Sequence, residues 1–430
     1  MKKVGLVSLG CHKNLVDSEN ILGLFDRNGY EITNDPADSD IIVINTCGFI
    51  ESSKKESIEN ILEMLQYGKK VVVTGCLAER YLDDLKKEIP EVDVYIPIRD
   101  YKEFNKHLYL IDNSIDKSLG VNDNYRIVST GPYSAFLKIG EGCDNRCSYC
   151  AIPLIRGHFV SRDMDAIINE AKDLAKNGIK EVVVLEQDTT KYGIDFHNPD
   201  INIVSLLKKL LEIEGLEYIR LLYLYPDEIS DELIELMGNE PRLTPYFDIP
   251  IQHSEDHILK NMYRRGDKEF LLNLFNKIRA KVPNAILRTT VMVGFPGESE
   301  EDVDNLINFM EEVKFDHLGA FTYSQEEGTP AAEFPNQVEE CVKKDRHARV
   351  MKAQQKISYQ QNKKHVGEVM EGLVIGKEND NYLLRSYWNA PDDVDGKIYF
   401  SSDAPLKNGD KVKVKINNAF IYDLMGEYVR

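Results

Sequence analysis

One short loop of the chain reads Glu141–Gly142–Cys143–Asp144–Asn145–Arg146–Cys147–Ser148–Tyr149–Cys150 and places three cysteines at C-x3-C-x2-C spacing. An apolar run over residues 134–139 precedes it and predicts a strand that ends where this cysteine loop begins. Three thiolates so close in sequence can bind one metal centre, whereas four ligands fill an ordinary iron–sulfur or zinc site. The loop therefore predicts a metal centre that keeps one position for a further ligand.

A zinc site is the alternative at this loop. His158 follows the three cysteines and would complete a Cys3His structural zinc site. Zinc sites of that kind usually pair two distant halves, whereas these cysteines share one short segment. An iron–sulfur cluster on Cys143, Cys147 and Cys150 is therefore favoured.

The amino-terminal part of the chain carries a second set of three cysteines. Residues 1 to about 105 alternate strand-like and helical runs, which is typical of a parallel α/β sheet. Cys11, Cys47 and Cys76 each come shortly after a predicted strand, at 4–9, 41–44 and 71–73. The carboxyl ends of parallel strands lie at one edge of the sheet, where ligands bind. We therefore expect the three cysteines to converge on a second metal centre, although cysteines also occur as small buried side chains.

Two further domains are predicted after a polar linker at about residues 112–132. The central one alternates six strands with helices, including a long amphipathic helix at 338–365, and indicates a partial (β/α)6 barrel like part of a TIM barrel. The last shows five short strands separated by turns, as in a small all-β, OB-like barrel. The predicted fold class is therefore α/β, with domains at 1–130, 131–365 and 366–430. The predicted strands of these two domains are 135–139, 181–185, 218–224, 247–250, 287–293, 318–323, 367–376, 382–387, 396–400, 411–416 and 419–424.

Other candidate ligand contacts lie in or after the central strands. Gln187 follows the second strand, and Arg220 lies in the third, where it can pair with a carboxylate in a bidentate manner. Gly294 follows the fifth strand, where a glycine lets the backbone approach a ligand closely. The structural alternatives are an ion pair for Arg220 and an ordinary turn for Gly294.

The composition indicates a globular protein of the cytoplasm. Hydrophobic residues make up 42% of the chain and charged residues 29%, and no apolar run approaches the roughly 20 residues that cross a bilayer. The start of the chain enters a strand-like run without a signal-peptide pattern, so we expect no membrane association. In the cytoplasm, cysteines are ligands or catalysts more often than disulfides. The seventh, Cys341, lies in a predicted helix as an ordinary side chain.

The charge of the chain is strongly acidic, with a formal net charge of −19 at pH 7. The last 65 residues, 366–430, carry 11 acidic and 8 basic side chains. Proteins that bind nucleic acids usually present a basic face to the phosphates. The balance therefore makes a tRNA partner less favoured than a basic protein.

Together these features resemble the radical-SAM methylthiotransferases over essentially the whole chain. The resemblance rests on the cysteine loop, the three strand-end cysteines and the terminal barrel, which is called a TRAM domain in that family. It implies two 4Fe–4S clusters, one on each cysteine set, and S-adenosylmethionine (SAM) as both radical source and methyl donor. Tyr149 would pack against the adenine of SAM, its alternative being an ordinary core tyrosine. The reaction inserts a methylthio group at a C–H bond and needs an external electron donor.

Branches of this family differ in substrate. One modifies the β-carbon of an aspartate in the twelfth small-subunit ribosomal protein, and others modify adenosines in tRNA. The stretches 10–19, 221–228, 248–253 and 323–330 resemble the ribosomal-protein branch, and the acidic balance favours the same substrate. Trp388 is either an exposed anchor for that protein or a core residue.

Two other functions remain open on the sequence. A tRNA adenosine methylthiotransferase would carry the same clusters and cofactor. A zinc-binding, non-catalytic factor associated with the ribosome would use the same cysteines as structural ligands.

Overall fold

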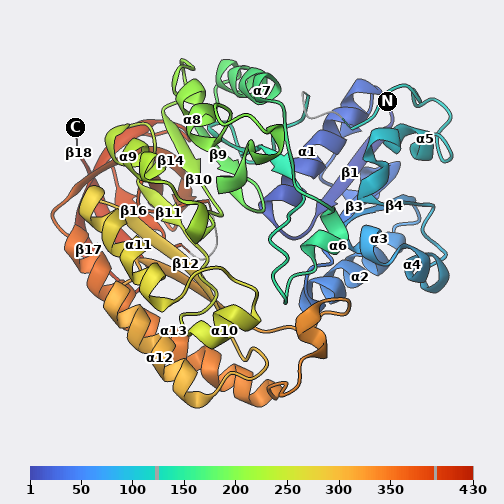
Figure 1. Cartoon of the computed structure of the whole chain (residues 1–430). Helices are drawn as coiled ribbons and strands as arrows, with labels where there is room; N and C mark the ends of the chain where they lie inside the picture. Colours follow the sequence, from blue (N-terminus) through green and yellow to red (C-terminus); the bar gives the residue numbers. More distant parts are fainter. Residues whose placement is uncertain (122–124, 392–394, 430) are drawn as a thin grey trace.

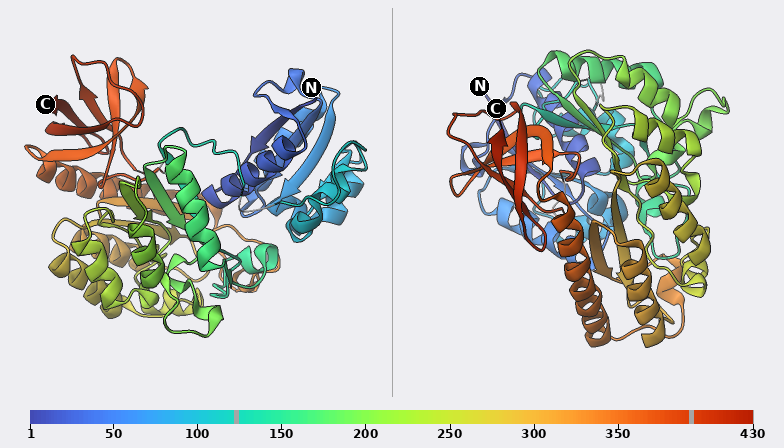
Figure 2. Two further views of the ribbon diagram at one scale, coloured as in Figure 1. Left: turned by 90° about the horizontal axis from the view of Figure 1, so that it is seen from above. Right: turned by 90° about the vertical axis from the view of Figure 1, so that its left-hand side faces the viewer.

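The computed structural model describes residues 1–121, 125–391 and 395–429. Three parts follow one another along the chain (Figure 1). An amino-terminal sheet and a small closed barrel lie on different sides of a central set of parallel strands (Figure 2). The α/β fold class with a terminal all-β barrel is thereby confirmed.

The amino-terminal part is a five-stranded parallel sheet in the order β2-β1-β3-β4-β5. It contains the three predicted strands and two short edge strands, β2 and β5, whose few residues carry little periodic pattern. Helices α1 and α5 cover one face, and α2, α3 and α4 cover the other, so β3 and β4 are almost entirely buried. The elements are β1 (Lys3–Ser8), α1 (His12–Arg27), β2 (Glu31–Ile32), β3 (Ile41–Thr46), α2 (Glu51–Leu65), β4 (Lys70–Gly75), α3 (Cys76–Arg80), α4 (Leu82–Glu88), β5 (Val94–Ile96) and α5 (Phe104–Leu108).

The central part contains the six predicted strands as two parallel sheets, β6-β9-β10 and β11-β12-β13. A backbone bridge between Ile219 and Leu243 links the two sheets in one partial barrel. Strand β10 ends at Leu221, earlier than predicted, because Tyr223 adopts a left-handed backbone with φ of 61°. The strands are β6 (Ser134–Lys138), β9 (Glu181–Leu185), β10 (Tyr218–Leu221), β11 (Tyr246–Asp248), β12 (Ile286–Val293) and β13 (His317–Thr322); a hairpin of β7 (Gly140–Glu141) and β8 (Val160–Ser161) follows β6.

Helices surround the central strands and bury the main hydrophobic core against them. These helices are α6 (Ile152–Arg156), α7 (Met164–Lys176), α8 (Ile203–Leu211), α9 (Asp231–Asn239), α10 (Asp256–Asn261), α11 (Lys268–Lys281), α12 (Glu300–Val313) and α13 (Glu340–Asn362). The predicted long helix is α13, but its buried face is mostly polar rather than apolar. Gln354 illustrates why, because it donates a hydrogen bond to the backbone oxygen of Phe315 at 2.9 Å.

The carboxyl-terminal part is a closed barrel in the order β14-β15-β16-β18-β17. In the segment predicted as its last strand, 419–424, Ala419 ends β17 and Leu424 begins β18. Residues 420–423 form the turn between these strands, closed by a bond from Phe420 N to Asp423 O at 2.8 Å. The barrel packs against the amino-terminal ends of the central strands, where Tyr246 donates to Asp395 at 2.8 Å. Its strands are β14 (Val369–Glu378), β15 (Asn381–Ser386), β16 (Ile398–Ser401), β17 (Lys411–Ala419) and β18 (Leu424–Val429).

Trp388 is a core residue, and the exposed-anchor hypothesis is wrong. Its side chain is 0% exposed, and its ring packs edge-on to that of His317 at 4.7 Å. The reason is the junction between the closed barrel and the central strands, which a large apolar side chain fills. Among the described residues, no helix has the length and apolar character required to cross a membrane.

Candidate metal centres at the domain interface

The first three cysteines meet at the carboxyl edge of the amino-terminal sheet. Cys11 immediately precedes α1, Cys47 directly follows β3, and Cys76 is the first residue of α3 after β4. Burial raises the pKa of Cys47 and that of Cys76, the latter to about 12, and a charge on Cys11 contributes to both shifts. The three thiols therefore lie within electrostatic reach of one another, as strand order predicts.

Gly10 and Asn14 bring these three loops together. Gly10 has a left-handed φ of 87°, and a β-carbon there would lie only 2.8 Å from the Cβ of Cys47. The amide nitrogen of Asn14 donates to the backbone oxygens of Leu9 and Thr46, each at 2.9 Å. Its amide oxygen lies 3.6 Å from the sulfur of Cys76. One side chain thus connects the loops after β1 and β3 to the third cysteine.

Replacing Gly10 with alanine should remove the metal centre of this set. Alanine is strained in the left-handed region by about 1–2 kcal/mol, and its methyl group would push against Cys47. Gly29 offers a matched control, because it has a φ of 78° and nothing within 4 Å of its β-carbon position. We expect iron analysis to show loss of metal in Gly10→Ala and full metal in Gly29→Ala. Equal metal content in both variants would contradict the role given to Gly10.

The Cys143–Cys150 loop is held by hydrogen bonds from several neighbouring loops. Asn145 donates to Asp188, which follows β9, at 2.7 Å. Ser148 N donates to the backbone oxygen of Met262 at 3.0 Å, and its own backbone oxygen accepts from Ala331 N at 2.8 Å. These bonds fix the loop at the carboxyl ends of the central strands, where barrels of this kind place their sites.

Cys147 lies beside a cationic side chain and an aromatic ring. The guanidinium of Arg264 lies 4.0 Å from the Cys147 sulfur, and the hydroxyl of Tyr225 lies 3.8 Å from the same atom. Arg264 also stacks 4.0 Å above the centre of the Tyr225 ring. A buried positive charge at this position favours a thiolate and an anionic cluster over a neutral thiol. Tyr149 is half-buried and packs against the small hydrophobic cluster that includes Met262.

The sulfur spacing fits a cluster better than a single metal ion. Three ligands on one zinc ion lie within about 3.8 Å of one another, since each zinc–sulfur bond is about 2.3 Å. In the part of the chain that the structure describes, neither cysteine set has its three sulfurs within 4.8 Å of each other. The side chain of His158 is 79% exposed and bonds Asp144 at 2.7 Å, so it does not complete a Cys3His site. A 4Fe–4S cluster, whose ligands bind different iron atoms, does not require its cysteine sulfurs to lie that close together.

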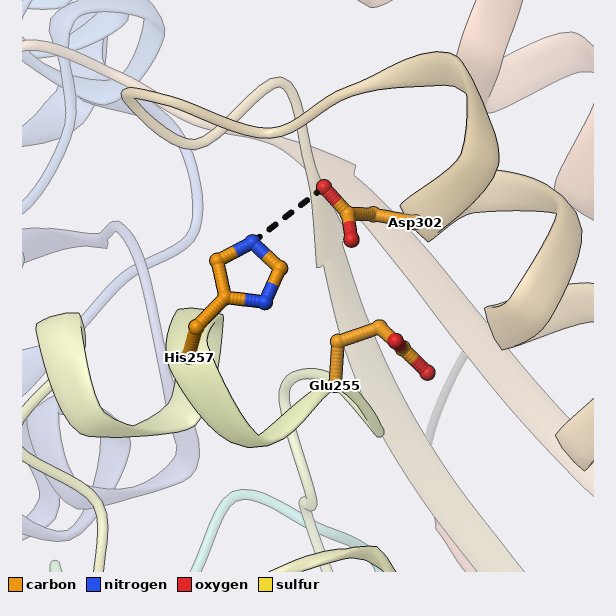
Figure 3. Close-up of side chains that lie close together, drawn as sticks. All are labelled: Glu255, His257 and Asp302. Atoms are coloured by element: carbon orange, nitrogen blue, oxygen red, sulfur yellow. Dashed lines mark ion pairs between the residues drawn. The ribbon is translucent and has the colours of Figure 1, made fainter.

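Glu255, His257 and Asp302 form the one group within metal-ligand spacing among the described residues (Figure 3). His257 lies 3.4 Å from an oxygen of Asp302, but that carboxylate already caps α12 by accepting from Ser299 N at 2.7 Å. Asn305 donates to Glu255 at 3.2 Å. These side chains therefore have structural partners and need no metal.

Arg156 joins the two cysteine sets across the domain boundary. Its guanidinium bonds Asp17 of α1 at 2.8 Å and Glu141 of the cysteine loop at 3.0 Å, and it lies 3.5 Å from the sulfur of Cys76. Lys138 bonds the same two carboxylates at 2.5 and 3.1 Å. Burial alone would raise the pKa of Glu141, but the charges of Arg156 and Lys138 outweigh it and lower that pKa to about 2. The loop after β6 is thereby tied to the amino-terminal domain.

The other candidate ligand contacts occupy different places. Gln187 is half-buried beside Asp188, at the end of β9 and next to the cysteine loop. Arg220 is wrong as a ligand contact, because it is 1% exposed, bonds Glu181 at 3.0 Å and donates to Ser386 O of the closed barrel at 2.7 Å. These partners lie at the amino-terminal ends of the strands, away from the cysteine loop.

Gly294 allows the close packing of helix α13 and does not leave room for a ligand. It has a φ of 74°, and a β-carbon there would lie 2.3 Å from a side-chain carbon of Lys343 in α13. Its backbone N–H donates to the Glu298 carboxylate. The close approach that a glycine permits is therefore used by the protein's own helix.

Sequence reasoning missed Asn14, Arg156 and Arg264. Asn14 lies three residues after Cys11 in the first turn of α1, and Arg156 ends the short helix after the cysteine loop. Their spacing to the cysteines is a weak signal, because Asn14 contacts residues of other loops of its own sheet and Arg156 contacts residues of another domain. Arg264 is far from every cysteine in sequence, and no local pattern marks it.

Three family models match successive parts of the chain. They are the uncharacterized protein family UPF0004 at residues 3–97, the radical SAM superfamily at 137–310 and the TRAM domain at 366–429. Among solved structures, the radical SAM methyltransferase TsrM from Kitasatospora setae, with cobalamin and a 4Fe–4S cluster bound, has a TM-score of 0.58 and 14% identity. That match covers 77% of this chain and 74% of the other and shows a shared fold.

Curated relatives match over the full length of the chain. A protein from Desulforamulus reducens named ribosomal protein uS12 methylthiotransferase RimO is 47% identical over 99% of both chains. Proteins of the same name from Acetivibrio thermocellus and Clostridioides difficile are 46% and 45% identical. These matches cover 100% and 99% of this chain and 98% and 99% of the relatives.

Proposed function

The chain belongs to the RimO family of radical-SAM methylthiotransferases, and we propose on this premise that it adds a methylthio group to the β-carbon of an aspartate in ribosomal protein uS12. Full-length identity of 44–47% to proteins with that name supports the assignment. The single structural observation that carries it is the meeting of two cysteine sets across one domain interface, joined by Arg156.

Each cysteine set has a separate task in this proposal. Cys143, Cys147 and Cys150 would hold one 4Fe–4S cluster, and Cys11, Cys47 and Cys76 would hold the other. When bound, the clusters and SAM supply the radical that removes a β-hydrogen and the methylthio sulfur that replaces it. The protein supports this chemistry by burying two cysteines of each set, Cys47 and Cys76 in one and Cys143 and Cys147 in the other. The polar network of Arg156 and Lys138 fixes the position of one set relative to the other.

The environment of the cysteines suits cluster assembly. Burial, together with the charge of Cys147, raises the pKa of Cys143 to about 11, so the metal-free thiol is protonated at neutral pH. Binding iron must therefore release protons, as it does in other thiolate sites. Tyr149 and Gln187 border the cysteine loop and are proposed to contact SAM.

The choice of substrate is tested by direct comparison. Purified enzyme with both clusters restored, given SAM and an external electron donor, should add one methylthio group to uS12 and leave tRNA unmodified. Mass spectrometry of both products measures this. The net charge of −19 favours the basic protein over tRNA, and modification of tRNA alone would refute the proposed substrate.

Metal analysis tests the clusters themselves. We expect about eight irons and matching labile sulfide per chain, which is the content of two 4Fe–4S clusters. Zinc without labile sulfide would instead indicate a structural metal protein.

We also propose that the enzyme acts in the cytoplasm, because ribosomal proteins are made and assembled in that compartment.

A further inference from the structure

Lys13 has a buried ammonium group that makes one long hydrogen bond and one contact with an aromatic ring. It lies in the first turn of α1, two residues after Cys11, and is 6% exposed. Its Nζ donates one long hydrogen bond, 3.4 Å, to the backbone oxygen of Glu186 and lies 3.9 Å from the centre of the Tyr223 ring. Within the described ranges, no carboxylate oxygen lies within 4.0 Å of this nitrogen. A buried ammonium group favours an anionic or polar partner beside it, and these described side chains leave part of its hydrogen-bonding capacity open.

Glu186 is a second unsatisfied group beside this ammonium. Its side chain is 1% exposed, and neither carboxylate oxygen has a hydrogen-bond partner among the described residues. Burial, reinforced by the charge of Glu141, raises the pKa of Glu186 to about 8, so the carboxyl is largely protonated at neutral pH. It therefore does not neutralise Lys13, and its O–H and C=O groups are available to a polar ligand.

The two groups lie between the cysteine sets. Lys13 reaches from the amino-terminal domain onto the central strands, because Glu186 directly follows β9 and Tyr223 comes shortly after β10. The cysteine loop follows the neighbouring strand β6. The ring of His12 stacks on the ring of Phe136 in that strand, with 4.3 Å between the ring centres. Tyr223 holds its strained left-handed backbone at this same point. Strained residues of this kind often mark functional positions.

We propose that Lys13 binds the side-chain carboxylate of the target aspartate. The inference rests on the proposed function and adds the residue that selects its substrate. In aspartate, the β-carbon is bonded directly to the carboxylate carbon, so an ammonium that fixes the carboxylate also fixes the carbon to be modified. Glu186 would bond a backbone amide of the same peptide. SAM offers a carboxylate too, and Gln187, a proposed SAM contact, directly follows Glu186, so the KM for SAM is measured as well.

The experiment compares uS12 with a uS12 variant whose modified aspartate, located by mass spectrometry, is replaced by asparagine. The dissociation constants of both proteins are measured on enzyme with both clusters restored and no reductant. Wild-type enzyme should bind the aspartate form about 10- to 100-fold more tightly, because asparagine leaves the ammonium unpaired. Lys13→Met and Lys13→Gln should each reduce this ratio to about threefold or less.

Lys87→Met is the control, because Lys87 is exposed on α4, where its ammonium group pairs with the neighbouring Glu88 at 2.9 Å. It should keep the wild-type ratio. An unchanged ratio in both Lys13 variants would overturn the inference, as would a tenfold rise in the KM for SAM with the ratio preserved. If wild-type enzyme fails to modify uS12 at all, the proposed function fails first and this inference with it.

Discussion

Replacing Cys47 with alanine should leave SAM cleavage intact and abolish methylthio transfer, whereas replacing Cys147 should abolish both. The two cysteines are matched in burial, because each is 8% exposed, and they belong to different cysteine sets. Cys47 follows β3 in the amino-terminal domain, and Cys147 lies on the loop after β6, beside Arg264. In the proposed function, the electron that cleaves SAM is needed only at the cluster on Cys143, Cys147 and Cys150. The sulfur is needed at the cluster on Cys11, Cys47 and Cys76.

Two measurements separate these outcomes. Iron should fall from about eight to about four atoms per chain in either variant, which shows that each set binds its own cluster. The cleavage product of SAM is then quantified without uS12, and the modified aspartate is quantified with it. If Cys47→Ala loses SAM cleavage while keeping four irons, the division of labour between the two sets is wrong.

Replacing Arg156 with methionine should destabilise the contact between the first two domains by about 3–5 kcal/mol. The side chain of Arg156 is 1% exposed, and the substitution would leave Asp17, 3% exposed, with Lys138 as its one ion-pair partner among the described residues. Breaking one partner of a buried network costs more than the network itself contributes, because the remaining charges stay desolvated. Methionine fills a similar volume and so isolates the loss of charge and hydrogen bonds.

Urea unfolding of the metal-free protein measures this change. Arg99→Met is the control, since Arg99 pairs with Glu79 at the surface and is 56% exposed. The control should change the free energy of unfolding by less than about 0.5 kcal/mol. Arg156→Lys should recover part of the stability, because it restores the charge but not the bonds to both Asn14 and Glu141. Equal stability of Arg156→Met and the control would contradict the structural role of the network.

Much of the fold was predictable because its signals are local. The buried runs of β3 and β4 and the cysteines that follow them sit within a few residues of each other, and strand order then places their ends at one edge. The prediction failed where local pattern and backbone geometry disagree. Tyr223 ends β10 by adopting a left-handed conformation, and the apolar residues 420–422 form a turn although they resemble a strand.

By itself, the sequence determined the fold class, the two sets of three cysteines and the chemistry that such sets support. Those features depend on residue types and spacings within single segments. Only the tertiary structure decided that Arg220 supports the closed barrel, that Trp388 is buried, and that Arg156 and Lys13 lie between the two sets. Each of these side chains takes its role from partners in another domain. The partners of these side chains come into contact only when the domains pack together, and the spacing of residues within one segment does not reveal such contacts.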